Sequence, residues 1–335
     1  MFRRILIANR GEIALRIVRA CHELGIEAVA VYSTADASCA HVLEADHAVC
    51  IGPPPPVSSY LSIANVISAA RISGCEAVHP GYGFLAENTT FARSCEQQDL
   101  VFIGPTPKSM DDLGDKSLAK QLMAEAGLPT IPGSRGTVGG IREAERVAGK
   151  LGYPVMLKAV AGGGGRGMRL VDASDQLERA FLAAAAEAQG AFGNGDLYVE
   201  KVIVNPHHIE VQVLGDGRGR VLTMGERDCS IQRRHQKIVE ESPSPLLDPK
   251  TRQTLQEHVT AACSHVAYAS AGTLEFLADD KRNLYFMEMN TRVQVEHPVT
   301  EMVSGVDIIQ EQIRIAAGGP LPYTGAVAPR GHAME

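Results

Sequence analysis

The stretch Met287-Glu288-Met289-Asn290-Thr291-Arg292-Val293-Gln294-Val295-Glu296-His297-Pro298 alternates polar and apolar side chains. Successive side chains of an extended strand point to opposite faces, so this alternation predicts a strand with one polar and one apolar face. The polar face would hold Glu288, Asn290, Arg292, Gln294 and Glu296. An exposed edge strand with a ladder of charges is the alternative, but it explains poorly why amides are interleaved with the charges.

These polar side chains suit a metal ion and a polyanion. Oxygen donors such as those of Glu288 and Asn290 fit Mg²⁺, which proteins usually hold through one or two carboxylates plus substrate phosphates. Arg292 adds a planar cation that can bind an anion through two hydrogen bonds. The stretch therefore predicts a site for a metal and an anionic substrate.

A second carboxylate is expected from the preceding strand. Residues 272–277 predict a strand, 279–283 a polar turn, and 284–287 the start of the return strand. This hairpin would bring Glu275 opposite Glu288, where two like charges repel unless a cation lies between them. The pairing strengthens the prediction of a metal site.

Outside this hairpin, the first third of the chain alternates predicted strands and helices. Strands are expected at 3–8, 28–32, 48–51, 77–79 and 101–104, with helices at 13–21 and 60–73. This order is typical of an α/β fold with a doubly wound parallel sheet. Because G-x-G-x-x-G is absent after the first strand, a dinucleotide site is not expected there.

Composition shifts suggest further units. A helix through Gly114-Asp115-Lys116 is expected to end near Gly127, and residues 134–203 predict helix, strand, glycine loop, strand, helix and strand. Strands dominate from 204 onward. We therefore predict an N-terminal domain at 1–113, a connecting helix at 114–133, an α+β subdomain at 134–203 and a strand-rich part at 204–335.

The glycine loop lies between two predicted strands. Residues 162–167 contain five glycines, whose exposed N–H groups can surround phosphate oxygens, although a flexible linker is an equal alternative. Lys158, just before the loop, supplies a point charge for phosphate and favours a nucleotide lid. The strand at 197–203 would then act as a hinge beside a base.

Residues 227–237 form a dense basic run in an acidic chain. A solvated loop is one interpretation, and a clamp for reacting anions is the one we favour. Cys229 lies within this run, and an inert buried thiol is an equal interpretation of this residue alongside a part in the clamp.

Composition limits the function classes. The chain has 335 residues, a net charge of -7, a pI near 5.9 and no Trp, which argues against nucleic-acid binding. Its seven cysteines contain no C-x-x-C pair, so neither a zinc site nor a disulfide framework is indicated. The first apolar run is too short for a signal peptide or membrane span. We expect a cytoplasmic protein that binds no membrane.

Together, several motifs resemble biotin carboxylase, the ATP-grasp component of acetyl-CoA carboxylase and related biotin-dependent carboxylases. The resemblance extends from residue 1 to 335 and rests on segments 7–14, 79–88, 226–230, 233–237 and 288–301 together with the glycine loop. It implies a Rossmann-like, pre-ATP-grasp N-terminal domain followed by an ATP-grasp fold with a glycine-rich lid. It also implies that family members continue past Glu335, so the C-terminal part is expected to be incomplete and this chain to carboxylate biotin poorly by itself.

The resemblance further implies roles for individual residues. ATP would be bound by Lys116, Lys158, Gly164, Gly165, Glu200, Lys201, Ile203, His208, Gln232 and His235. Metal ions, Mg²⁺ or Mn²⁺, would be held by Glu275, Glu288 and Asn290. Bicarbonate would be bound by Lys237, Arg292, Gln294, Val295 and Glu296. Of these, Arg292, Glu296 and Lys237 would be catalytic, with Glu296 as the general base, and Tyr82 would line the biotin pocket.

The implied reaction transfers a carboxyl group to biotin through carboxyphosphate. Forming carboxyphosphate requires that the charge of the transferred phosphoryl group be neutralised. Implied partners are a biotin carboxyl carrier protein, carboxyltransferase subunits and a second copy of the chain. Acetyl-CoA carboxylase is the favoured parent enzyme, with propionyl-CoA, methylcrotonyl-CoA and pyruvate carboxylases as alternatives. Two further alternatives are another ATP-grasp ligase and a nucleotide-binding assembly module without turnover.

Overall fold

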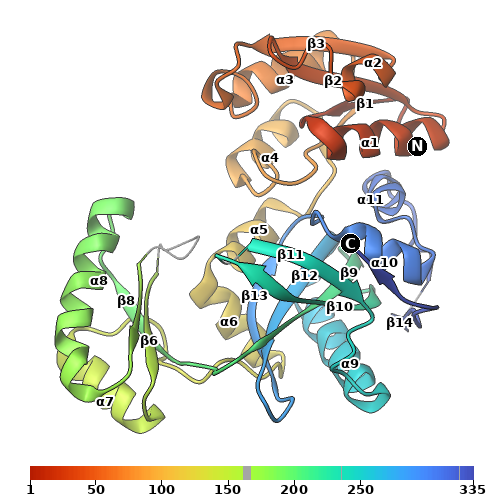
Figure 1. Cartoon of the computed structure of the whole chain (residues 1–335). Coiled ribbons are helices and arrows are strands. Elements are labelled where there is room, and N and C mark those ends of the chain that lie inside the picture. Colours follow the sequence, from red (N-terminus) through yellow and green to blue (C-terminus); the bar gives the residue numbers. More distant parts are fainter. Residues whose placement is uncertain (161–166, 235, 324) are drawn as a thin grey trace.

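The computed structural model describes residues 1–160, 167–234, 236–323 and 325–335, and contains three sheets (Figure 1). The N-terminal sheet is parallel with strand order β3-β2-β1-β4-β5. Its strands are β1 (Arg4–Ile7), β2 (Glu27–Ser33), β3 (His47–Gly52), β4 (Ala77–His79) and β5 (Val101–Phe102). Its helices are α1 (Gly11–Glu23), α2 (Ala40–Glu44), the 3₁₀ turn η1 (Pro56–Ser58), α3 (Ile63–Ile72) and α4 (Thr89–Gln97). The predicted doubly wound sheet is confirmed.

The connecting segment is two helices, α5 (Pro107–Gly114) and α6 (Lys116–Glu125). The expectation of one continuous helix through Asp115 was wrong. Asp115 has an extended backbone, and its carboxylate accepts hydrogen bonds from the N–H groups of Ser117 and Leu118 at 2.9 and 2.8 Å. This side chain caps the start of α6, an arrangement that interrupts the preceding helix.

The second sheet is antiparallel with order β7-β6-β8, and α7 and α8 share its apolar core. The elements are α7 (Ile141–Leu151), β6 (Val155–Ala159), β7 (Met168–Val171), η2 (Ser174–Gln176), α8 (Leu177–Phe192) and β8 (Leu197–Lys201). Their order matches the prediction for 134–203. The tip between β6 and β7, which includes Gly164 and Gly165, lies outside the described residues.

The third sheet is the largest, with order β13-β12-β9-β10-β11-β15 and β14 paired to β10. Its strands are β9 (His207–Asp216), β10 (Val221–Arg233), β11 (Gln236–Ser242), β12 (Ala269–Ala278), β13 (Leu284–Asn290), β14 (Gly325–Ala326) and β15 (Ala333–Met334). Its helices are α9 (Pro249–His265), α10 (His297–Ser304) and α11 (Ile308–Ala316). Ile309 and Ile313 of α11 share an apolar core with Ile13 and Ile17 of α1, which joins this sheet to the N-terminal one. The domain boundaries at 113, 133 and 203 stay predictions.

One local expectation was wrong. The strand predicted over 287–296 ends at Asn290, because the following residues turn toward the N-terminal sheet. The described residues of the basic run at 227–237 form the end of β10 and the start of β11 rather than a solvated loop. The favoured interpretation of this run, a clamp for reacting anions, stays a prediction.

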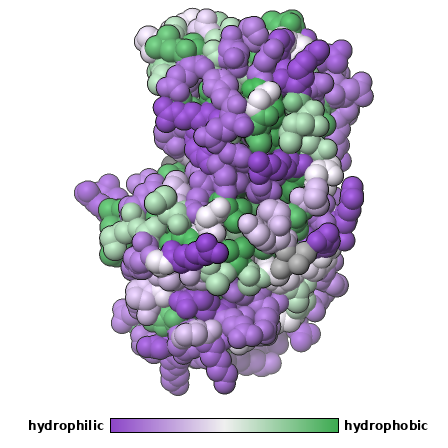
Figure 2. All heavy atoms as spheres, turned by 90° about the vertical axis from the view of Figure 1, so that its right-hand side faces the viewer, coloured by the Kyte–Doolittle hydropathy of each residue, from purple (hydrophilic) through white to green (hydrophobic). Residues whose placement is uncertain are grey.

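The surface is mainly polar on the face shown in Figure 2, where hydrophobic residues form separate patches. Within the described ranges, no helix combines the length and the apolar character that crossing a bilayer requires.

Candidate active site

Three glutamates form a row across neighbouring strands of the large sheet. Glu288 on β13 pairs with Glu275 on β12, which pairs with Glu210 on β9. The row ends on β10, where Arg227 pairs with Glu210. Residues paired across antiparallel strands have neighbouring side chains, so this register concentrates negative charge on one face. The predicted pairing of Glu275 with Glu288 is confirmed.

Lysine side chains balance this charge. The Nζ atom of Lys237 lies 3.1 Å from Glu275 and 2.7 Å from Glu296, and it also contacts Glu210. Burial alone would raise the pKa of Glu275, but His208 and Lys237 outweigh burial and lower that pKa well below its usual range. Lys237 therefore supplies a cation beside Glu275, and the metal site inferred from the pairing of Glu275 with Glu288 stays a prediction.

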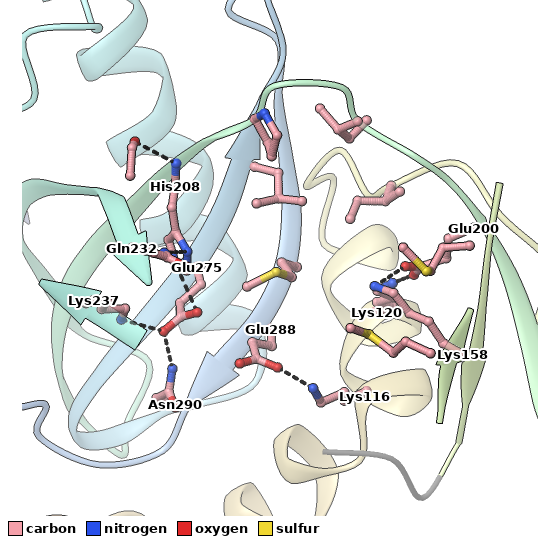
Figure 3. Close-up of a pocket in the computed structure, with 18 of the residues that line it drawn as sticks. Lys116, Lys120, Lys158, Glu200, His208, Gln232, Lys237, Glu275, Glu288 and Asn290 are labelled. Atoms are coloured by element: carbon pink, nitrogen blue, oxygen red, sulfur yellow. Dashed lines mark hydrogen bonds and ion pairs between the residues drawn. The ribbon is translucent and has the colours of Figure 1, made fainter. Parts of the chain in front are cut away.

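Lys116 compensates the outer end of the row. Its Nζ atom lies 2.6 Å from Glu288, and this interaction raises the pKa of Lys116 although burial opposes the shift (Figure 3). Lys116 begins α6, so the ion pair connects this helix to β13.

The opposite wall is built by α6 and the three-stranded sheet. Glu200 on β8 contacts Lys120 of α6 and lies 2.6 Å from the Nζ atom of Lys158 on β6 (Figure 3). Burial, together with the neighbouring lysines, lowers the pKa of Lys120 to about 7 and that of Lys158 to about 8. The negative charge of Glu288 opposes both shifts by stabilising the charged ammonium groups.

Between the two walls lies a cavity of about 850 Å³. Nearly all described residues predicted for the site line it. These are Lys116, Lys158, Glu200, Lys201, Ile203, His208, Gln232, Lys237, Glu275, Glu288, Asn290, Arg292, Gln294, Val295 and Glu296. Apolar side chains, including Ile131, Met156 and Met287, provide a surface for a flat ring.

The segment after β13 carries the residues that were predicted to bind an anion. Arg292 donates from Nε to Glu87 at 2.9 Å and from Nη2 to Asn290 at 3.1 Å. The N–H of Thr291 also donates to Glu87, at 3.1 Å. Glu87 follows β4, so this contact connects Arg292 to the N-terminal domain, which is distant in sequence.

Glu296 lies at the end of this segment, directly before α10. Burial raises its pKa, but the charges of Arg227 and Lys237 outweigh burial and lower it. Glu296 is therefore ionised at neutral pH.

Tyr82 does not line the cavity described above, and its hydroxyl bonds to the Glu12 carboxylate. His235 lies outside the described residues, as do both lid glycines. Burial raises the pKa of the Cys229 thiol well above its usual range, in agreement with the interpretation of an inert thiol.

Sequence reasoning missed Glu210, Lys120, Glu87 and Arg227. Two signals were available: Glu210 alternates with the apolar Ile209 and Val211, and Lys120 follows Lys116 by four residues, which places both on one helix face. Glu210 also belongs with His208 and Glu275 to a group whose potential ligand atoms lie within 4.8 Å of one another.

Comparisons with known proteins assign this architecture to a family. The family model described as "Biotin carboxylase, N-terminal domain" matches residues 1–110, and "Carbamoyl-phosphate synthase L chain, ATP binding domain" matches 115–324. A biotin carboxylase of Nostoc sp. is 56% identical over 335 residues, covering 100% of this chain and 75% of that protein. The chain belongs to the biotin carboxylase family. Members of this family are ATP-dependent ligases.

Other relatives show how widely this family is distributed. The 2-oxoglutarate carboxylase small subunit of Hydrogenobacter thermophilus is 54% identical, covering 97% of this chain and 68% of that protein. A chloroplastic biotin carboxylase of Populus trichocarpa is 53% identical, covering 99% of this chain and 63% of that protein.

Solved structures of biotin carboxylases share the fold. The Campylobacter jejuni biotin carboxylase in complex with beta-gamma-ATP matches with a TM-score of 0.95 and 51% identity, covering 100% of this chain and 75% of that one. The biotin carboxylase domain dimer of Hydrogenobacter thermophilus 2-oxoglutarate carboxylase, in complex with MgADP, ADP and bicarbonate, matches with a TM-score of 0.93 and 53% identity, covering 100% and 74%. The predicted ATP-grasp fold is therefore confirmed.

Proposed function

We propose that this protein uses ATP to carboxylate biotin on a carrier protein, with bicarbonate as the carbon source and carboxyphosphate as the intermediate. The main supporting observation is the meeting of two walls in one cavity. One wall carries Lys116, Lys120 and Lys158, which suit a polyphosphate, and the other carries Arg292, Gln294 and Glu296, which suit a small anion with an acidic proton.

In this proposal, the nucleotide lies between α6, the three-stranded sheet and the large sheet. The lysines neutralise phosphate charge, which is the main requirement of phosphoryl transfer. His208, Gln232, Lys201 and Ile203 line the same cavity and would contact the rest of ATP. Gly164, Gly165 and His235 keep their predicted roles in closing over and binding the nucleotide.

Bicarbonate would be bound by Arg292, Gln294, Val295 and Lys237. Arg292 is pre-oriented by Glu87 and Asn290, so it loses little freedom when it binds the anion. Glu296 is ionised and can accept the bicarbonate proton as the general base. The deprotonated anion then attacks the γ-phosphorus of ATP, and Tyr82 is proposed to help bind biotin for the subsequent step.

The oxygen donors of Glu275, Glu288 and Asn290 fit Mg²⁺ or Mn²⁺, because they are hard ligands held together. The Nδ2 atom of Asn290 donates to Glu275 at 2.6 Å, and Glu275 pairs with Glu288 across the hairpin. When bound, such an ion would polarise the transferred phosphoryl group and offset its charge.

We further propose that the reaction is the first half-reaction of acetyl-CoA carboxylase, which leads to malonyl-CoA and fatty acids. The partners would be a biotin carboxyl carrier protein, carboxyltransferase subunits and a second copy of the chain. The 2-oxoglutarate carboxylase relative favours a second candidate, in which the carboxyl group passes to a 2-oxo acid.

The test is ADP release from ATP with bicarbonate and free biotin, compared with ATP and amino-acid acceptors. The proposal predicts release that requires bicarbonate and increases with biotin. Release that depends on an amino acid instead would identify a different ligase, and ATP binding without release would identify an assembly module.

A further inference from the structure

Arg227 lies in the middle of the large sheet and is fully buried, with 0% of its surface exposed. A buried guanidinium needs hydrogen-bond acceptors on several sides, because an unpaired buried charge is costly. The acceptors come from β9, β12, the segment after β13, and α10. They are Glu210 (3.3 and 3.1 Å), Gln212 (2.9 Å), Thr273 (3.3 Å), Gln294 (2.6 Å) and Thr300 (3.0 Å).

The contact with Gln294 determines which way its amide points. The Oε1 atom of Gln294 accepts from Arg227 at 2.6 Å, and its Nε2 atom donates to Glu275 at 2.9 Å. A guanidinium only donates and an ionised carboxylate only accepts. The reversed amide would place NH₂ against the guanidinium and oxygen against the carboxylate, so two favourable contacts would become repulsive.

This orientation has a chemical consequence. The amide nitrogen has two hydrogens, and the bond to Glu275 uses one of them. Because Gln294 lines the cavity, its second hydrogen can be donated to an anion there. A reversed amide would offer an oxygen instead, which repels an anion.

We propose that Arg227 is a positioning residue that fixes the Gln294 amide so that it donates a hydrogen bond to bicarbonate. This inference rests on the proposed function. Arg227 does not line the cavity, so it would orient bicarbonate through its bond to Gln294 rather than by direct contact. A purely structural role for Arg227 would change the kinetics of ATP and bicarbonate together, whereas positioning changes bicarbonate selectively.

The experiment measures KM for bicarbonate and KM for ATP in Arg227→Met, Arg227→Lys and Thr300→Val. Methionine removes all donors, and lysine keeps the charge beside Glu210 but lacks the planar fork. Thr300→Val deletes one acceptor of Arg227 in a side chain of similar shape, so it keeps the test decisive if the arginine variants do not fold.

We expect the arginine variants to raise KM for bicarbonate by about tenfold to hundredfold, the factor for losing a hydrogen bond to a charged group. Thr300→Val should raise it at least about threefold, and KM for ATP should stay within about twofold throughout. Arg252→Met is the matched control, because Arg252 bonds Glu226 and backbone carbonyls away from the cavity. It should lower thermal stability without a selective change in bicarbonate KM.

A double-mutant cycle with Gln294→Ala completes the test. If Arg227 acts through Gln294, the effect of Arg227→Lys on bicarbonate KM should nearly vanish once Gln294 is absent. An equal effect in both backgrounds, or a bicarbonate KM within twofold of wild type in the folded variants, overturns the inference. Failure of the wild-type protein to release ADP in response to bicarbonate would instead overturn the proposed function.

Discussion

Replacing Lys237 by Met should destabilise the fold by about 3–5 kcal/mol, the cost of removing one partner from a buried ion pair. Lys237 compensates Glu210, Glu275 and Glu296, whose side chains are only 0%, 5% and 6% exposed. At the 3.1 Å distance to Glu275, one such pair has a gross Coulomb energy of about 5 kcal/mol at an effective dielectric of about 20. The variant loses this compensation for three carboxylates, so we expect the upper part of the range.

The assay is equilibrium unfolding in urea at pH 7.5 for wild type and Lys237→Met. Lys108→Met is the control, because Lys108 pairs with Asp112 on the surface and its side chain is 83% exposed. The control should change the free energy of unfolding by about 0.5 kcal/mol or less. A Lys237→Met variant within about 1 kcal/mol of wild type would refute the reasoning that Lys237 compensates the carboxylate row.

The same comparison has a defined pH dependence. In the wild type, burial raises the pKa of Glu275 and Glu296, but the surrounding cations outweigh burial and lower both values. Carboxyl groups with lowered pKa stabilise the fold above the unfolded pKa of about 4.3, and this contribution is lost as pH falls through the folded pKa. The stability difference between wild type and variant should thus be fully present at pH 7–8 and decrease as pH falls below about 4.3.

Three further predictions concern separate parts of the molecule. Glu87→Gln should raise KM for bicarbonate about fivefold with little loss of stability, since Glu87 orients Arg292 from a partly exposed position; an unchanged KM would contradict this. Lys120→Met should raise KM for ATP about tenfold, the effect of losing a charge-assisted contact, while Lys108→Met leaves it unchanged. Gly215→Ala should destabilise the fold by about 3 kcal/mol or more in thermal unfolding, because the added Cβ would lie 2.0 Å from the carbonyl oxygen of Tyr268. The control Gly149→Ala, at an exposed position with open space on α7, should instead stabilise the fold by about 0.5–1 kcal/mol.

The core of the site could be predicted because its register is local. The hairpin between β12 and β13 is closed by Asp279, whose carboxylate accepts from the N–H groups of Lys281 and Asn283. Such a turn specifies which residues oppose one another, so the pairing of Glu275 with Glu288 followed from the chain itself.

The rest depends on contacts between distant segments. The strand ends after Asn290 because Glu87, from another domain, binds Thr291 and Arg292. Likewise, the positions of Glu210 and Arg227 in the row follow from the pairing of β9 with β12 and β10, which no local pattern specifies. Lys120 was different, since its spacing from Lys116 was visible in the sequence.

The central claim is that bicarbonate itself attacks the γ-phosphorus of ATP in the cavity between α6 and the large sheet. The most direct test supplies bicarbonate labelled with ¹⁸O, together with ATP and biotin, and determines the isotope content of the released phosphate. The account predicts that one labelled oxygen passes from bicarbonate into phosphate. Phosphate whose new oxygen comes only from water would contradict it.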